Sequence, residues 1–215
     1  MHLGLFAAAM FAGAAYLFVP LLGVAGPAVI AWKGAGVGLL ALWAWLARRD
    51  RIGRTIALVL ALGAAGDILL DAVGLEVGAA AFAAGHLVAI LLYLRHRRTP
   101  LSASQRWLAM LLIPLSLIIA AGLLRGQDGL AGALLYVAIV AAMTAAAWCS
   151  RFSRYRVGVG AVLFLVSDLI LFARLAGHIE PGVGGVLVWS AYFGGQALIA
   201  WGVVTSAVRP AATER

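Results

Sequence analysis

Two aspartates in the sequence share a local pattern that suits acid–base chemistry. Asp67 lies in the segment Gly66-Asp67-Ile68-Leu69-Leu70, and Asp168 lies in Ser167-Asp168-Leu169-Ile170-Leu171. Two carboxyl groups brought into one cavity can divide their roles, one protonated as an acid and the other ionised as a base. We therefore predict Asp67 and Asp168 as a catalytic pair, against the alternative that such buried carboxyls only hold helices together.

The surroundings of both aspartates are strongly apolar. Of 215 residues, 65% are hydrophobic and only 11% are charged, whereas charged residues make up roughly a quarter of a soluble domain. A soluble core of this size cannot bury so much apolar surface, but a lipid-facing surface needs no burial. The sequence therefore predicts an integral membrane protein, in which ionisable groups inside a span are costly and are functional candidates by default.

The apolar stretches define the elements that would position these residues. A spanning helix needs roughly 17–25 largely apolar residues. The sequence offers eight such stretches: Leu3–Val24, Pro27–Ala47, Arg54–Val73, Val77–Leu94, Trp107–Leu124, Leu130–Cys149, Val157–Leu175 and Val183–Val208. The first lacks a preceding basic region, so we interpret it as a retained span and not as a signal peptide. We predict an all-α bundle of eight transmembrane helices, forming a single transmembrane domain over 1–208 with a short cytoplasmic tail over 209–215.

Basic residues alternate with the predicted spans. Arginine clusters fill the second, fourth and sixth connections and follow the last span, at positions 48, 49, 51, 54, 95, 97, 98, 106, 151, 154, 156, 209 and 215. The positive-inside rule then predicts that both termini are cytoplasmic. It also assigns the net charge of +8 to topology and lipid headgroups, and not to nucleic acid. We expect a multi-pass protein of a bacterial inner (cytoplasmic) membrane.

The two aspartates are predicted to reach a similar depth. They belong to the third and seventh spans, and each follows a basic connection by a dozen or so residues. With a rise of about 1.5 Å per residue, both lie near or beyond the bilayer midplane, toward the outer side. Because four spans separate them, their helices run in the same direction. This pattern indicates a weak parallel repeat of two four-helix halves.

Other polar residues fall inside the predicted spans. Lys33 reaches a comparable depth, where it would either neutralise a carboxylate or hold a substrate phosphate. His86 is a packing residue or a functional group. Tyr136, Tyr192 and Gln196 form ordinary interhelical hydrogen bonds or line the headgroup side of a substrate cavity. We predict all five as substrate-binding residues.

Several other residues and motifs are weaker functional candidates. Asp71 falls one helical turn after Asp67, near the outer surface, and is expected at most to line a cavity mouth. No His-Glu-x-x-His or Gly-x-Ser-x-Gly motif occurs, and only His86 of four histidines lies deep in a span, so we predict neither a metal nor a cofactor. The 26 glycines are interpreted as close helix packing, as at Gly34 and Gly38.

The order of these motifs resembles the YhhN-type lysoplasmalogenase family over nearly the whole chain. The matching elements are Gly66-Asp67 with two aliphatics, Phe82 to Gly85-His86, Tyr136 to Met143, Gly160-Ala161 with Phe164 and Ser167-Asp168, and Tyr192-Phe193 with Gln196 and Leu198-Ile199. One position departs from the family. The family's second span has lysine followed by proline, whereas Lys33 is followed by Gly34.

The resemblance implies hydrolysis of the vinyl ether bond of lysoplasmalogens, with lysoplasmenyl-ethanolamine or -choline as the lysophospholipid substrate. The products would be a fatty aldehyde and a glycerophospho-headgroup. By analogy with glycosidases, one aspartate would donate a proton and the other would stabilise the cation and activate water. The aspartate nearer Lys33 is expected to be the ionised one.

Three alternatives remain open from the sequence. The first is a proton-coupled transporter of a small molecule or lipid, because carriers also combine repeated halves with intramembrane acids. The second is a hydrolase of another lysolipid bond, and the third is a structural membrane subunit. Neither the oligomeric state nor the leaflet of substrate entry follows from the sequence.

Overall fold

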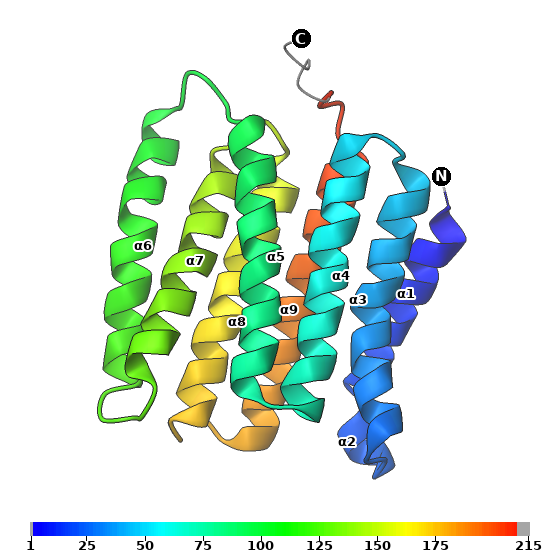
Figure 1. The fold of residues 1–215 in the computed structure, drawn as a ribbon, viewed down its shortest axis with the longest axis vertical. Helices are drawn as coiled ribbons and strands as arrows, with labels where there is room; N and C mark the ends of the chain where they lie inside the picture. The colour runs from blue at the N-terminus through cyan, green and yellow to red at the C-terminus, as the bar shows by residue number, and fades with distance from the viewer. Residues whose placement is uncertain (1, 210–215) are drawn as a thin grey trace.

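The computed structural model describes residues 2–209, and over these residues the helices pack side by side in one bundle (Figure 1). The elements are α1 Leu3–Tyr16, α2 Val19–Leu22, α3 Pro27–Ala47, α4 Arg51–Ala72, α5 Leu75–Arg95, α6 Ala103–Leu123, α7 Leu130–Trp148, the π-helical turn η1 Arg154–Gly158, α8 Val159–Leu175 and α9 Pro181–Val204. Seven helices, counting η1 together with α8, are long and apolar enough to cross a membrane. The chain is therefore an all-α, multi-pass integral membrane protein.

Seven of the eight predicted spans coincide with these helices to within about four residues at each end. The first segment differs. It was predicted as one helix over Leu3–Val24, but α1 ends at Tyr16 and a short α2 begins at Val19. Gly23 and Gly26, both with positive φ, then lead the chain into α3. With 14 residues, α1 is about 21 Å long, shorter than a hydrocarbon core of roughly 30 Å.

The connections rich in arginine gather at one end of the bundle. The loops α3–α4, α5–α6 and α7–α8 lie there together with the start of α1 and the end of α9 (Figure 1). We call this the basic end. The chain therefore makes an even number of passes over the described residues, as the alternation of charge predicted. The side of the membrane that this end faces stays a prediction, and the predicted tail lies, after Arg209, outside the described residues.

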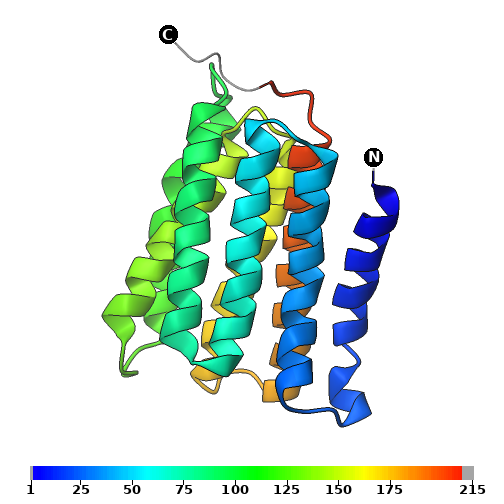
Figure 2. The same cartoon turned by 45° about the vertical axis from the view of Figure 1, so that its right-hand side comes forward.

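The α9 helix is central to the packing. It contacts α3, α4, α8 and η1, whereas α1 and α6 stand at opposite edges of the bundle (Figures 1 and 2). About half of the apolar stretch of α9 is buried inside the bundle, whereas only about a tenth of the corresponding stretch of α6 is buried. Side chains on α9 can therefore reach both the α4 and the α8 aspartate helices.

Glycines allow the closest helix contacts. A Cβ atom added at Gly160 would lie 2.7 Å from the carbonyl oxygen of Gly195, and one added at Gly195 would lie 2.6 Å from that of Gly160. On α3, a Cβ at Gly34 would lie 2.6 Å from the Ile68 side chain. The interpretation of the span glycines as packing residues is confirmed at these contacts.

Arg48 ties the α3–α4 connection to the end of α9. Its Nη1 donates to the carbonyl oxygen of Val203 at 2.7 Å and to Oγ of Ser206 at 2.8 Å, and its other terminal nitrogen donates to Val208 O. Its Nε also donates to Asp50, which caps α4 by accepting from the Gly53 amide at 2.9 Å. The last turn of α9 and the segment after it therefore gain a charged donor, in addition to the Ser206 amide and hydroxyl that also donate to Val203 O.

Candidate active site

The first aspartate lies deep in α4. Asp67 follows Arg51 by 16 residues, which places it about 24 Å from the basic end of that helix. Its side chain is almost fully buried, and Tyr192 Oη on α9 donates a 2.7 Å hydrogen bond to its Oδ2. The preceding Gly66 brings α4 close to α5, because a Cβ there would lie 2.8 Å from the Phe82 ring.

The second aspartate has a corresponding partner on another helix. Asp168 on α8 follows Arg154 by 14 residues and is also buried. Tyr136 Oη on α7 donates a 3.1 Å hydrogen bond to its Oδ2. The same hydroxyl lies 3.5 Å from Nε2 of His86 on α5, a longer and weaker contact. Each aspartate is therefore oriented by a tyrosine hydroxyl from a neighbouring helix.

Both aspartates line one cavity of about 470 Å³, which we call the polar cavity. It lies between the later turns of α4 and α8 and the first turns of α3 and α9, so it is located toward the end opposite the basic end. Its polar and aromatic lining consists of Tyr16, Lys33, Asp67, Asp71, Phe82, Phe164, Ser167, Asp168, Arg174, Trp189 and Tyr192. The two predicted catalytic side chains thus face a common space.

A second cavity of about 510 Å³ adjoins the first, and we call it the apolar cavity. Its walls come from α5, α7 and α8 and are mostly aliphatic or aromatic, including Ala79, Ala83, Leu135, Ile139, Leu171 and Phe172. It shares Phe82 and Asp168 with the polar cavity. Among the described acidic residues, Asp168 is the one that lines both.

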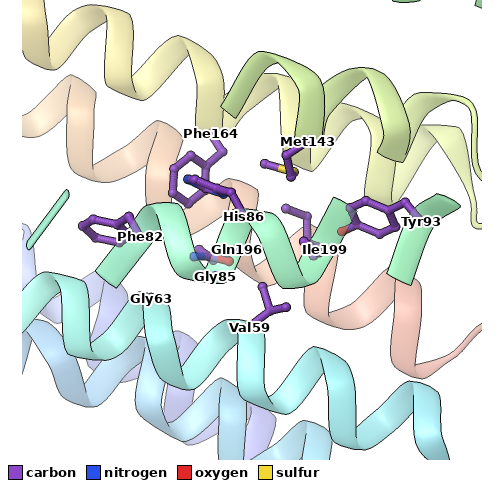
Figure 3. Close-up of a pocket in the computed structure, with 11 residues that line it drawn as sticks. Val59, Gly63, Phe82, Gly85, His86, Tyr93, Met143, Phe164, Gln196 and Ile199 are labelled. Carbon is purple, nitrogen blue, oxygen red and sulfur yellow. The ribbon is translucent and has the colours of Figure 1, made fainter. Parts of the chain in front are cut away.

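Two of the predicted binding residues lie elsewhere. His86 and Gln196 line a small cavity of about 20 Å³, with room for a water-sized molecule (Figure 3). The His86 ring meets the Phe164 ring edge-on, with centroids 4.7 Å apart. Gly63 makes space for the amide, because a Cβ there would lie 2.9 Å from Gln196 Nε2.

Lys33 forms an ion pair with Asp71, a residue for which the sequence predicted only a place at the cavity mouth. Its Nζ lies 2.9 Å from both carboxylate oxygens of Asp71, and the two side chains are 15% and 31% exposed. Asp71 was expected only to line the mouth, although its i, i+4 spacing from Asp67 places both on one face of α4. Because Lys33 pairs with Asp71, nearness to Lys33 no longer supports assigning the ionised role to Asp67 or Asp168.

The predicted binding residues are therefore divided among three cavities. Lys33 and Tyr192 line the polar cavity, Tyr136 lines the apolar cavity, and His86 and Gln196 line the small one. Arg174 was not predicted as a lining residue. Its position at the end of an aspartate helix, six residues after Asp168, was the signal that could have found it. Within residues 2–209, no three His, Cys, Asp or Glu side chains converge closely enough to hold a metal ion.

Comparison with known proteins gives one family match. The model of the YhhN family matches residues 28–203, a range that includes both aspartates, both tyrosines that bond to them, and Lys33. No curated protein and no solved structure matches the chain. Because the match covers well over half of its length, the chain belongs to the YhhN family.

Proposed function

We propose that this protein is a membrane hydrolase that cleaves the vinyl ether bond of lysoplasmalogens. One observation carries the proposal: two buried aspartates, each bonded to a tyrosine hydroxyl, line one cavity, and Asp168 also lines an adjoining apolar cavity. Buried carboxyls that converge on a cavity are typical of acid–base sites. The family resemblance supplies the vinyl ether as the bond.

The pair of cavities suits a single-chain amphiphile. A lysolipid has one hydrocarbon chain and one polar headgroup, joined through glycerol. The chain would occupy the apolar cavity and the glycerophospho part the polar cavity, so that the ether bond lies at the junction beside Asp168. Leu135, on the wall of the apolar cavity, is 66% exposed, which is consistent with a chain entering sideways from the lipid.

The reaction needs one proton donor and one activated water. Asp168 protonates the alkenyl carbon that is not bonded to oxygen, which produces an oxocarbenium ion. Asp67, ionised, stabilises this cation and takes a proton from the attacking water. The resulting hemiacetal then breaks its bond to the glycerol oxygen, which takes the proton held by Asp67. The hemiacetal hydroxyl gives its proton to Asp168, so both carboxyls return to their starting states. One water is consumed, and a fatty aldehyde and a glycerophospho alcohol are released.

Tyr192 and Tyr136 act as positioning residues in this scheme. Each hydroxyl fixes one carboxyl oxygen and leaves the other oxygen of Asp67 or Asp168 available to the substrate or to water. Orientation of this kind reduces the rearrangement that the site must undergo during the reaction.

The test is mass spectrometry of purified protein in detergent with lysoplasmenyl-ethanolamine. The wild type should release a fatty aldehyde and glycerophosphoethanolamine, and Asp67→Asn and Asp168→Asn should each lower the rate by about 100-fold or more. Glu180→Gln is the matched control, because Glu180 is an exposed carboxylate that lines none of these cavities. It caps α9 by accepting from the amides of Gly182 and Val183, and the glutamine oxygen can still accept there. The rate of this variant should equal that of the wild type.

Two further substrates and one transport assay separate the alternatives. A saturated 1-alkyl analogue should stay intact, since it has no double bond to protonate. Release of fatty acid from a 1-acyl lysolipid, with the vinyl ether untouched, would favour a hydrolase of another bond. Unchanged lipid in all samples, with movement of lipid across vesicles that both asparagine variants abolish, would favour a carrier.

A further inference from the structure

Arg174 stands at the mouth of the polar cavity with an uncompensated charge. It lies in the last turn of α8, is half-buried, and lines the cavity. Over residues 2–209, the two ion pairs join Lys33 to Asp71 and Arg48 to Asp50, so neither involves Arg174. A basic residue at a helix C-terminus is favourable for the helix dipole. An arginine that served only the helix dipole would not need to line a cavity.

Lys33, the other cation of this cavity, is already neutralised. Its Nζ contacts both oxygens of Asp71 at 2.9 Å. An anionic group entering the mouth therefore meets a neutral Lys33–Asp71 pair on one wall and the free guanidinium of Arg174 on the other. The ionised Asp67 lies one helical turn deeper than Asp71, so Arg174 is the cation at the level of the mouth and favours an anion beside it.

Glycines on α9 hold the arginine against the cavity wall. A Cβ added at Gly184 would lie 3.0 to 3.2 Å from Cδ, Cγ and Cβ of Arg174, so the aliphatic stem lies directly across this glycine. A Cβ at Gly185 would lie 3.9 Å from Nη1, and Gly185 itself lines the cavity. The guanidinium is therefore kept beside the cavity by the packing of its stem.

We infer that Arg174 binds the phosphate of the lysophospholipid headgroup. This inference rests on the proposed function and assigns the chemistry of its headgroup site. A planar guanidinium matches two phosphate oxygens with parallel hydrogen bonds, which an ammonium cannot do. Arg174 follows Asp168 by six residues, about 9 Å along α8 toward the mouth. A glycerophospho group extending outward from the ether bond meets the arginine at that level.

The experiment measures binding and not hydrolysis. A saturated 1-alkyl lysophosphatidylethanolamine is titrated into purified protein in detergent, and 1-alkylglycerol, which has no phosphate, is titrated in parallel. Ligand-induced thermal shifts report occupancy, together with the change in total tryptophan fluorescence, to which Trp189 in the polar cavity contributes as one of seven tryptophans. Arg174→Gln should weaken binding of the phospholipid by about 10-fold to about 100-fold and leave binding of the 1-alkylglycerol unchanged.

Three further variants sharpen the test. Arg174→Lys should recover only part of the affinity, because lysine keeps the positive charge but cannot form two parallel hydrogen bonds to the phosphate. Gly184→Ala should weaken phospholipid binding several-fold by displacing the stem. Arg125→Gln is the matched control, because Arg125 is exposed in the α6–α7 connection at the same end of the bundle and lines none of the cavities. Its affinity for both ligands should equal that of the wild type.

The inference is overturned if Arg174→Gln binds the phospholipid as tightly as the wild type does, or if it loses both ligands equally with a lowered melting temperature. It is also overturned if inorganic phosphate alone binds with the same dependence on Arg174, since the site would then serve the free anion. A wild type that binds the phospholipid through Arg174 but hydrolyses no vinyl ether would contradict the proposed function and leave the phosphate site standing.

Discussion

The hydroxyl of Tyr192 donates a 2.7 Å hydrogen bond to Oδ2 of Asp67, although the two residues are 125 positions apart in the sequence. Both side chains are buried, at 5% and 2% exposure, and both line the polar cavity. Tyr136 and Asp168 form a second pair of the same kind across α7 and α8. In the proposed mechanism, these two contacts between helices hold the carboxyls in position.

Removing either tyrosine hydroxyl should affect both stability and rate. Tyr192→Phe and Tyr136→Phe each leave a buried carboxyl without its donor, which costs about 1–3 kcal/mol of stability. The rate of vinyl ether hydrolysis should fall by about tenfold in each variant, because the carboxyl is no longer held in one orientation. Thermal unfolding in detergent and initial rates measure the two effects.

Tyr155→Phe is the control for both tyrosines. Tyr155 is 82% exposed in η1 at the basic end, where it lines none of the three cavities. Its variant should match the wild type in melting temperature and rate. If Tyr192→Phe and Tyr136→Phe were equally silent, the tyrosines would have no positioning role.

The contact between α8 and α9 should tolerate no side chain at its centre. Gly195→Ala places a Cβ atom 2.6 Å from the Gly160 carbonyl oxygen, so the two helices must separate. We expect a loss of about 1–3 kcal/mol, the usual cost of overpacking, and a lower melting temperature. Gly194→Ala tests the neighbouring position, where nothing lies within 4 Å of an added Cβ. It should be neutral or stabilising, since alanine favours a helix over glycine. Equal melting temperatures for the two variants would contradict the close contact.

Arg48 should contribute more to folding than the other arginines of its connection. Arg48→Ala removes a charged donor from the carbonyl oxygens of Val203, Ser206 and Val208. Val203 O keeps the amide and the hydroxyl of Ser206 as donors, so the loss is that of the charged bonds. We expect about 1.5–3 kcal/mol of destabilisation, the range for hydrogen bonds to a charged group. Arg49→Ala removes an exposed arginine next in the chain and should change the unfolding midpoint little. If the unfolding midpoint of Arg48→Ala is no lower than that of Arg49→Ala, the hydrogen bonds of Arg48 do not stabilise the contact between this connection and α9.

Asp50 should make folding sensitive to acid. Partial burial opposes its ionisation, but the hydrogen bonds from Arg48 and from the Gly53 amide outweigh this and hold the pKa of Asp50 below its ordinary value. The folded state therefore binds a proton at Asp50 less readily than the unfolded state does. The stabilisation is present above the ordinary pKa of about 3.8 and is lost as the pH falls through the lowered folded value.

Melting temperatures from about pH 7 down to about pH 3 measure this linkage. The wild type should be more stable than Asp50→Asn at the higher pH, and the difference should narrow as the pH approaches the acid end. A difference that stays constant over the range would mean that ionisation of Asp50 does not contribute to folding.

Much of the architecture follows from the sequence because the membrane imposes it locally. Lipid offers no hydrogen bonds to the backbone, so each apolar stretch must form a helix long enough to cross, and its length can be counted along the chain. Pro27–Ala47 was predicted to the residue, and the arginine clusters predicted that the connections rich in arginine lie at one end of the bundle. The break between Tyr16 and Val19 was missed, because its residues are as apolar as the rest of the segment.

Only part of the candidate site could likewise be predicted from the sequence. Composition and depth were enough to select Asp67 and Asp168, because an ionisable group in lipid stands out against its neighbours wherever it occurs. The pairing of Lys33 with Asp71, the tyrosine partners, the separate cavity of His86 and Gln196, and the place of Arg174 were decided only by the tertiary structure. These contacts depend on how far each helix is rotated and how closely it approaches its neighbours. Glycine contacts such as Gly160 with Gly195 set those quantities, and they join segments that the sequence leaves far apart.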